Sequence, residues 1–354
     1  MTLDIRRHDA PIDELEADWD RLLEPDHPGA AFRSFPWIAA FYRHARPSVE
    51  PCVLVAREAG RVVGILPLYR ESTVLGGRWL RLAGDGIVGS DFLGVVARAA
   101  DEDRVADGCA RTLARGPFDE LYLDGVLDGD PLASRLARRL RAAVRFRSVC
   151  PAVTIGGSFR EYLAGRPAGV GTQWARRRRW LERQPGFRLE THTRPGSLAR
   201  ALAELVELHL ARWDHASTAV DGERVERFHL EALRGLARRG WARIDILSVG
   251  DMPVAALYGF RHGRRYAFYQ AGRDPAWRQR SVGTVLLGMV LERCFAEKLA
   301  EFDFLHGDES YKLAWATTAR NTVTVCASAR SIRAVASRWS RMAWQHARGV
   351  ARWI

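Results

Sequence analysis

Two successive sets of helix and strand signals restrict the fold of this chain more than any other feature of its sequence. Each set begins with two amphipathic segments of helical period and continues with three apolar runs separated by glycine-containing turns. The first set predicts helices at 11–24 and 36–45 and strands at 52–58, 61–70 and 78–84. The second set predicts helices at 197–213 and 226–240 and strands at 242–249, 252–260 and 264–272. This order indicates a duplicated α+β lobe.

A short sequence echo supports the duplication. The segments VGILPLY (63–69) and VAALYGF (254–260) share a valine, a small residue, a leucine and a final aromatic residue at the same spacing. Each segment is the middle strand of its predicted three-strand meander. A repeated lobe explains this match better than chance does.

Further signals complete each lobe. The first lobe continues with a strand at 119–126 and a helix at 130–143, and the second with a helix at 281–301 and a strand at 302–307. We therefore predict an α/β (α+β) fold of two tandem lobes, each with a mixed, mainly antiparallel sheet flanked by helices. The predicted divisions are a first lobe at 1–155, a basic linker helix at 156–190, a second lobe at 191–330 and a basic amphipathic helix at 331–354.

The charge of the chain indicates an anionic partner. The formal net charge is +12 and the pI is ≈ 10.1, which favours binding to nucleic acid, anionic lipid or a phosphorylated ligand such as coenzyme A. The arginine run at 176–179, flanked by Trp174 and Trp180, suits either RNA binding or a solvated helix face. The helix at 331–354 suits peripheral contact with an anionic membrane.

Several classes of protein are disfavoured. The five cysteines are widely spaced and form no CxxC pair, which is typical of reduced core thiols, and we expect no metal site. The first residues lack an apolar signal core, and no apolar run approaches the ~20 residues that a membrane helix needs. We expect a cytoplasmic protein, with peripheral membrane contact left open.

The order of several motifs resembles a known family. These motifs are PWIAAFYRH, GRVVGILPLYR, GSDFLGVV, LHLARW, the long segment PVAALYGFRHGRRYAFYQAGRDPAWRQRSVGTVLL, and EFDFLHGDESYKLAW. They resemble the GNAT-related acyltransferases of the CelD type, found in bacterial envelope and exopolysaccharide gene clusters. That family is similar to the FemABX aminoacyl transferases, which have two GNAT-like lobes. The resemblance covers about residues 10–325 and implies two GNAT-like lobes with an acyltransferase site in the second.

The start of the helix at 281–301 is the candidate donor site. A helix N-terminus offers unpaired backbone N–H groups and a partial positive charge, and glycine lets a ligand approach the backbone closely. Ser281, Val282, Gly283 and Thr284 therefore suit a pyrophosphate such as that of acyl-CoA, and Arg280 adds charge. An ordinary helix capped by Ser281 is the alternative.

Lys312 is the first candidate catalytic residue. It is one of only two lysines among 54 basic residues, and it follows the predicted strand 302–307, where open α/β sheets bind ligands. The resemblance implies a lysine near the reacting centre. Lys312 would stabilise negative charge that develops on an acyl donor, with Tyr311 beside it. A salt bridge to Asp308 or Glu309 without a catalytic role is the alternative.

The other candidates are less specific. Asp91, in GSDFLG, suits a group that orients or deprotonates an acceptor amine, or equally a turn-forming residue. His209 and Trp213 lie one helical turn apart and suit substrate binding, although a buried, satisfied histidine is the default. Gln270 shares a predicted strand face with Tyr266 and Phe268, and Asp303 is expected to point into the same cleft.

The favoured function is an acyl-CoA-dependent N-acyltransferase, with no metal. Its acceptor is an amine on a small molecule or glycan precursor, such as an amino sugar or another cell-envelope or exopolysaccharide precursor, in a cleft between the lobes. The alternatives are Fem-like aminoacyl transfer from charged tRNA and a non-catalytic GNAT-like scaffold. The loop RSVGT supports the scaffold, since the family often has Ser-Pro-Gly there.

Overall fold

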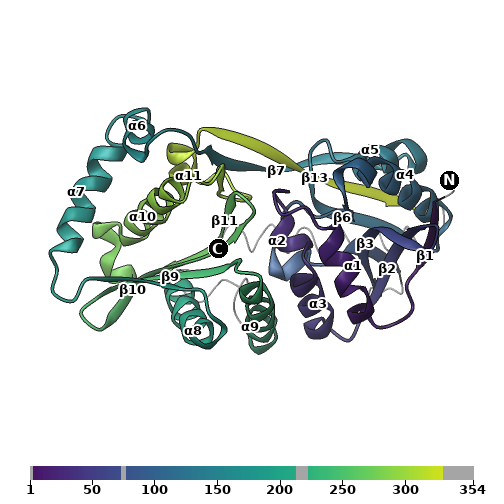
Figure 1. Cartoon of the computed structure of the whole chain (residues 1–354), viewed down its shortest axis with the longest axis horizontal. Helices are drawn as coiled ribbons and strands as arrows, with labels where there is room; N and C mark the ends of the chain where they lie inside the picture. Colours follow the sequence, from purple (N-terminus) through teal and green to yellow (C-terminus); the bar gives the residue numbers. More distant parts are fainter. Residues whose placement is uncertain (1–2, 73–76, 213–221, 330–354) are drawn as a thin grey trace. The chain divides into compact units, whose positions relative to one another are not determined.

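The computed structural model describes residues 3–72, 77–212 and 222–329 of the chain. It divides into two compact units (Figure 1), one formed by Met1–Ser148 with Asn321–Ile354 and the other by Val149–Arg320. The second unit is thus inserted into the first, and the chain passes between them within strands β7 (Ala143–Thr154) and β13 (Thr318–Ser328). The predicted helix at 331–354 lies outside the described residues.

The first unit has a mixed sheet in the order β1-β2-β3-β4-β6-β13, with the short β5 paired to β3. Its pairs are antiparallel except for β4 and β6, which are parallel. Its other elements have these bounds: β1 Asp4–Arg7, η1 Ile12–Leu15, α1 Glu16–Leu22, α2 Ala30–Arg33, α3 Phe35–His44, β2 Val49–Glu58, β3 Arg61–Ser72, β4 Arg78–Leu82, η2 Gly86–Val88, β5 Val96–Ala97, α4 Ala99–Arg115, β6 Glu120–Leu127 and α5 Pro131–Leu140.

The second unit repeats this plan in the order β7-β12-β11-β10-β9-β8. Here β11 and β12 are the parallel pair, in the place that β4 and β6 occupy in the first unit. The bounds are: α6 Phe159–Ala164, α7 Val170–Glu182, β8 Arg188–His192, α8 Pro195–Arg212, α9 Glu223–Arg238, β9 Ala242–Val249, β10 Met252–His262, β11 Arg265–Arg273, η3 Pro275–Arg280, α10 Val282–Ala296, β12 Glu301–Asp303 and α11 Ser310–Trp315.

The two predicted meanders are confirmed. The echoing segments 63–69 and 254–260 lie in β3 and β10, and each of these strands pairs with the strand before it and the strand after it. The turn between β2 and β3 has positive φ at both Ala59 and Gly60, which is the backbone of a two-residue hairpin turn. The mixed, mainly antiparallel sheets with flanking helices agree with the predicted fold class.

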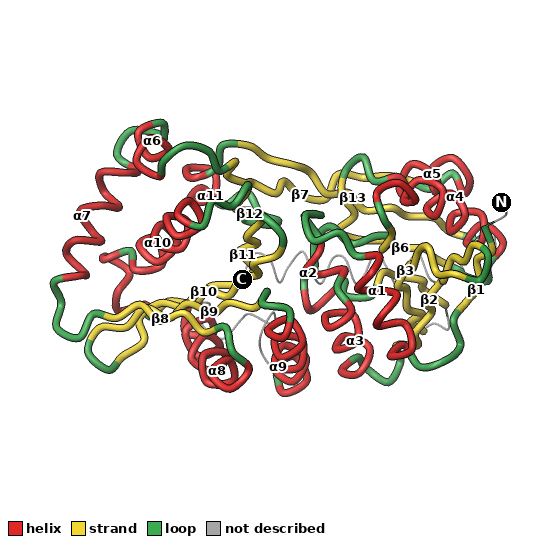
Figure 2. Tube along the Cα trace, viewed as in Figure 1, coloured by secondary structure: helices red, strands yellow, loops and turns green. Residues whose placement is uncertain are grey.

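In the second unit, helices cover both faces of the sheet. Figure 2 shows α8 and α9 on one side of β9 and β10, and α7 and α10 on the other. Helix α10 is apolar on nearly all sides, because it packs against the sheet on one side and against α7 on the other. Nine of its residues are buried, and most of them belong to one apolar cluster of this unit.

The divisions within the chain differ from the predicted ones at three places. Residues 149–155 belong to the second unit and not to the first. The basic helix α7 belongs to the second unit, because the side chains of Trp174 and Leu181 are buried in the core of that unit. Residues 321–329 belong to the first unit, because β13 pairs with β6 there. These assignments depend on contacts between residues that are distant in the sequence.

Candidate active site

Helix α10 begins at the end of β11 with its first turn open. Ser281 precedes the helix in the left-handed conformation (φ 53°), and its side chain makes no capping hydrogen bond. The N–H groups of Thr284 and Val285 both donate to the Ser281 carbonyl, at 3.0 Å each. Ser281 is therefore the N-cap residue of the helix, as the alternative predicted, but the helix has no side-chain cap.

Gly283 leaves open space in this first turn. A methyl group built on Gly283 would meet only one atom within 4 Å, the Arg273 Cδ at 3.7 Å, and its φ is not positive. The fold thus does not require glycine at this position. Its lack of a side chain leaves the backbone accessible to a ligand.

Strands β11 and β12 separate next to this turn. Their parallel pairing covers only three residues of each strand and ends at Ala267 and Asp303. After Asp303 the chain no longer pairs with β11. The N–H groups of Phe304 and Gly307 donate to carbonyls of β7, and β11 continues to Arg273. The carboxyl end of β11 therefore has no β12 partner, and it leads into η3 and α10.

Arg280 and Arg178 have an aromatic and an acidic partner. The Arg280 guanidinium lies 3.9 Å from the centroid of the Trp180 ring of α7, and Arg280 is exposed. Arg178 donates to Glu292 of α10 at 2.5 Å. The cation of Arg280 is thus positioned beside the start of α10, where it adds to the positive end of the helix dipole.

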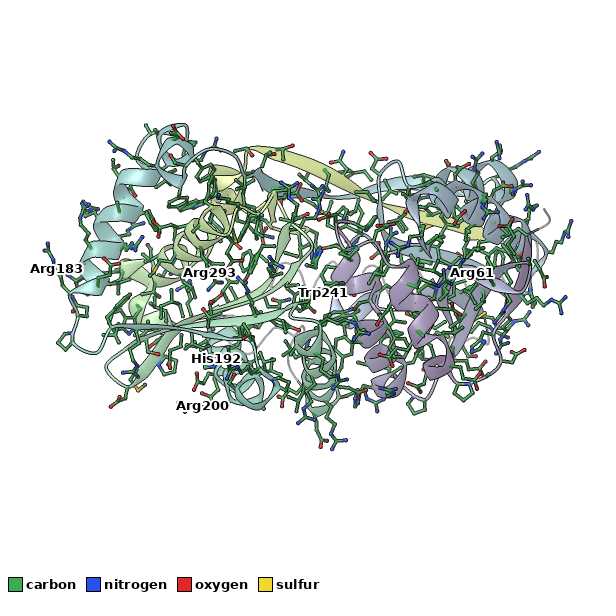
Figure 3. The ribbon with its side chains drawn as sticks, in the orientation of Figure 1. Arg61, Arg183, His192, Arg200, Trp241 and Arg293 are labelled. Carbon is green, nitrogen blue, oxygen red and sulfur yellow. The ribbon has the colours of Figure 1, made fainter. Side chains whose placement is uncertain are left out.

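Helix α10 is fixed in place at its middle and at its end. The buried Trp174 donates from Nε1 to the Val285 carbonyl at 3.1 Å and lies directly over Gly288. Arg293 forms two hydrogen bonds to Asp245 of β9, at 2.6 and 2.7 Å, and extends from α10 toward the strands (Figure 3). Burial lowers the pKa of Arg293, but the bonds to Asp245 outweigh it, so the net shift is upward. These contacts make the N-terminus of α10 a rigid platform.

Lys312 is buried and held by two acceptors. It lies in α11 with 6% of its surface exposed, and its Nζ donates to the His306 carbonyl at 2.6 Å and pairs with Glu309 at 2.9 Å. The predicted salt bridge to Glu309 is therefore present. An ammonium has three donors, and the described residues account for two of them. A charge-stabilising role for Lys312 stays a prediction.

Asp303 stabilises the turn after β12. Its Oδ1 accepts the N–H of Leu305 at 2.7 Å, and its Oδ2 accepts from Arg320 at 2.8 Å. Leu305 has a positive φ of 56°, so this bond holds a backbone conformation that L-residues seldom adopt. The structure therefore gives Asp303 a buried structural role instead of a place in an open cleft.

The expected grouping of Gln270 with Phe268 is wrong. A β-bulge interrupts the pairing of β10 with β11, so that Gln270 lies opposite Tyr258 and Phe268 lies opposite Gly259. Because Tyr258 and Gly259 are consecutive, their partners leave opposite faces of the sheet. Phe268 belongs to the apolar cluster around α10, and Gln270 is on the face of Tyr258.

Two of the remaining candidates lie in the core. His209 of α8 is buried, and its Nδ1 lies 3.0 Å from the Ala271 carbonyl of β11. Tyr311 is half-buried and packs against the apolar cluster of α10. Trp213 lies outside the described residues.

Asp91 belongs to the first unit and forms a buried ion pair. Its side chain is fully buried, and its Oδ1 accepts from Arg147 at 2.7 Å. Arg147 also pairs with Asp124 at 3.0 Å. Because the guanidinium stabilises the carboxylate form and the site is dry, this geometry favours a structural role over that of a general base.

Two structural partners were not anticipated. Asp245 forms an ion pair with Arg293, and the indole of Trp174 contacts Gly288. An acidic residue inside the apolar strand ARIDILSV is a detectable signal, since buried carboxylates are paired. The Trp174 contact had no local signal, because it joins residues over a hundred positions apart.

Some classes of site are not found in the described parts. No group of three or more His, Cys, Asp or Glu side chains in residues 3–72, 77–212 and 222–329 is arranged to hold a metal ion. Within the same ranges, every helix is too short or too polar to span a bilayer.

Comparison with known proteins identifies the second unit. The model of the acetyltransferase (GNAT) domain family matches residues 171–313. No curated protein has a sequence that matches the chain. The match includes α10 and most of α11, and it covers most of the second unit.

Solved structures share the fold of the whole chain. One is FemX, with 9% identity, 90% of this chain and 96% of that chain covered, and a TM-score of 0.61. Another is L-PGS from Bacillus licheniformis, with 10% identity, 92% and 96% covered, and a TM-score of 0.58. A third is a tandem GNAT protein from the clavulanic acid biosynthesis pathway, with 16% identity, 92% and 98% covered, and a TM-score of 0.50. The family match shows that the second unit of this chain carries an acetyltransferase (GNAT) domain, and the solved structures show that its two-unit fold is shared.

Proposed function

We propose that the second unit transfers an acyl group from acyl-CoA to an amine. The observation that carries this proposal is the open first turn of α10, which follows η3 and the end of β11 that has no β12 partner. Backbone N–H groups there suit the pyrophosphate of a coenzyme A thioester, and the space beside Gly283 admits it. Arg280 contributes positive charge at the rim of this turn.

The reaction follows from the chemistry of a thioester and an amine. The amine nitrogen forms a bond to the thioester carbonyl carbon, the carbon–sulfur bond breaks, and the thiolate leaves. We propose that the remaining donor of Lys312 stabilises the negative charge that develops on the oxygen or sulfur. Because Asp91 is buried and ion-paired, we assign the proton released by the amine to water.

The acceptor class that we propose is an amino sugar or another amine-bearing precursor of the cell envelope or an exopolysaccharide. This choice rests on the resemblance of the motifs to the CelD type. Aminoacyl transfer from tRNA is less well supported, because Trp174 of the basic helix is buried and cannot stack on a base.

Thermal unfolding with acetyl-CoA tests the donor site. A ligand at 100 times its Kd stabilises the folded state by ~2.7 kcal/mol, so the wild type should show a clear rise in Tm. Gly283→Ala should be at least as stable as the wild type without ligand but lose this rise, because the methyl group fills the approach to the backbone. Gly196→Ala is the matched control, since a methyl group there meets nothing within 4 Å.

The same assay separates the alternatives. A rise in Tm with charged tRNA that disappears steeply with salt, and no rise with acetyl-CoA, would favour the tRNA reading. The absence of any rise with either ligand, together with no transfer to an amino-sugar panel, would contradict an enzymatic function.

A further inference from the structure

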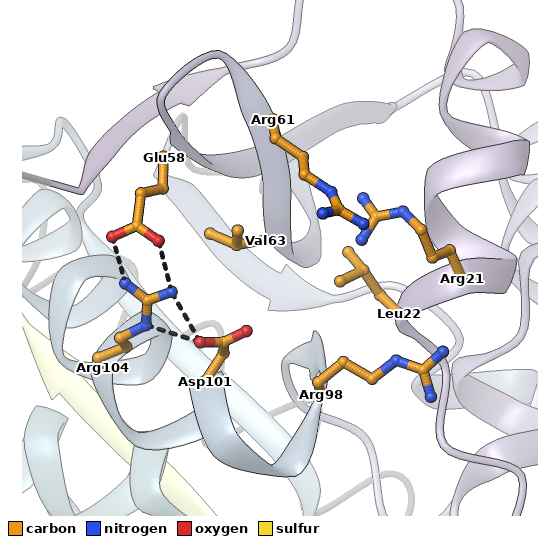
Figure 4. A pocket seen from close by; sticks show the side chains of 8 residues that line it. All are labelled: Arg21, Leu22, Glu58, Arg61, Val63, Arg98, Asp101 and Arg104. Atoms are coloured by element: carbon orange, nitrogen blue, oxygen red, sulfur yellow. Dashed lines mark hydrogen bonds and ion pairs between the residues drawn. The ribbon is translucent and has the colours of Figure 1, made fainter. Parts of the chain in front are cut away.

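The first unit contains a pocket that the acyltransferase reaction does not use. Its volume is ≈ 400 Å³, and its walls come from α1, from β2 and β3 beside their connecting turn, and from the start of α4. Figure 4 shows its side chains, which include four arginines and two carboxylates. This size is in the range of small-molecule sites, at about 300–1,000 Å³.

One wall of the pocket has one arginine and two carboxylates, which are bonded to each other. Arg104 donates to both oxygens of Glu58, at 2.6 and 2.9 Å, and to Asp101 at 2.8 Å. The hydrogen bonds with Arg104 hold the pKa of Glu58 below its ordinary value. Both carboxylates are therefore directed at Arg104, and they do not neutralise the opposite wall.

The opposite wall has three arginines, and the Arg98 guanidinium points away from those of Arg21 and Arg61 (Figure 4). Arg21 donates to Asp18 and to the Val62 carbonyl, both at 2.6 Å, and Arg98 has a longer bond of 3.3 Å to Glu24. The Arg61 side chain makes no hydrogen bond or ion pair with any residue in the described part of the chain.

A bound anion would stabilise the arrangement of Arg61 and Arg21. Figure 4 shows the two guanidinium groups pointing toward each other above Leu22. Both line the same pocket, and two like charges that face each other repel, whereas an anion between them is attracted to both. The floor below them is apolar, since Leu22 and Val63 are buried. The pocket thus combines a cationic wall with an apolar base.

We propose that this pocket binds a small phosphate monoester that carries an apolar group. A phosphoryl group has three acceptor oxygens, which suit several arginine forks better than the two oxygens of a carboxylate do. The apolar group would lie on Leu22 and Val63. Such a ligand would make the first unit a binding module in its own right, separate from the donor site on α10.

Phenyl phosphate is the probe for a direct test on the full chain. We expect isothermal titration to detect binding in the wild type at constant ionic strength. Arg61→Ala should weaken it about tenfold or more, as expected for the loss of a charge-assisted hydrogen bond, and Arg61→Glu should abolish it. Arg115→Ala is the control, because Arg115 is an exposed arginine at the far end of α4. Inorganic phosphate should bind more weakly, because it lacks the apolar group.

The outcomes against the proposal are specific. Equal binding by the wild type and Arg61→Glu would overturn it, and so would a wild type that does not bind phenyl phosphate. Equal affinity for phenyl phosphate and inorganic phosphate would refute the role of the apolar floor.

The test is independent of the acyltransferase proposal. Gly283→Ala in the second unit should keep phenyl phosphate binding, and Arg61→Ala should keep stabilisation by acetyl-CoA. If acetyl-CoA protection fails while phenyl phosphate binding depends on Arg61, only the donor site is refuted.

Discussion

Lys312 shows how a single residue can serve both the fold and the chemistry. Its ammonium ties the carbonyl of His306 to the carboxylate of Glu309 and so fixes the turn between β12 and α11. This turn includes Gly307 with a φ of 119°, where a side chain would collide with both Glu309 and Lys312. A compact ammonium fits between these acceptors, whereas the planar fork of arginine, the usual basic residue of this chain, does not.

We expect Lys312→Met to lower kcat for acyl transfer by about 10²-fold, the usual effect of removing one preorganised donor. Lys312→Arg should not restore kcat, because the larger guanidinium cannot occupy the same place. Lys298→Met is the control, since Lys298 is exposed beyond the end of α10. Steady-state kinetics measure kcat, and the Tm of each variant is compared with that of the wild type to exclude unfolding. Unchanged kcat in both Lys312 variants would reduce the residue to a structural ion pair.

Among the elements, α10 carries the candidate donor site and owes its position to α7. The helix has two glycines with opposite surroundings: Gly283 faces open space, and Gly288 faces the indole of Trp174. A methyl group on Gly288 would lie 2.6 Å from Trp174 Cε2, which is too close for any side chain. The close approach of α7 to α10 therefore depends on glycine at position 288.

Gly288→Ala should destabilise the protein by about 1–3 kcal/mol, because it overpacks a filled core. Gly283→Ala should be neutral or stabilising by ~0.5–1 kcal/mol, since alanine favours a helix more than glycine does. Denaturant unfolding of the two variants measures the difference on one helix. Similar stabilities for both would show that α7 does not pack over Gly288 as the structure has it.

At the scale of the whole molecule, the first unit is discontinuous in the sequence. Its strand β6 is almost entirely buried and pairs with β13, which returns to this unit only after the second unit is complete. The two ends meet locally, because Thr322 donates to the Ser148 carbonyl at 3.4 Å. The first unit thus needs residues from both ends of the chain.

We expect a fragment of residues 1–148 to lack cooperative unfolding, because β6 would expose its edge and its apolar face. Joining 1–148 to 321–329 through a linker of about four residues should restore it, since Ser148 and Thr322 are in contact and short connections are well tolerated. Near-ultraviolet circular dichroism during urea unfolding distinguishes the fragment 1–148 from the joined fragment. Cooperative unfolding of 1–148 by itself would show that β13 is dispensable.

Much of the candidate site was predictable and part was not. The glycine-containing start of α10 and the place of Lys312 after β12 follow from local order along the chain, and the structure has both. Asp91 and Gln270 could not be placed from the sequence. The burial of Asp91 depends on Arg147, a distant partner, and the face of Gln270 depends on a bulge that shifts the register by one residue.

The sequence by itself determined the duplicated order of helices and meanders, because hydrophobic period and turn residues are local properties that each segment carries alone. The tertiary structure alone decided that α7 joins the second unit, that β13 completes the first, and which carboxylates are paired in the interior. Those outcomes depend on contacts between residues far apart in the chain. No window of sequence contains both partners of such a contact, so only the folded chain defines them.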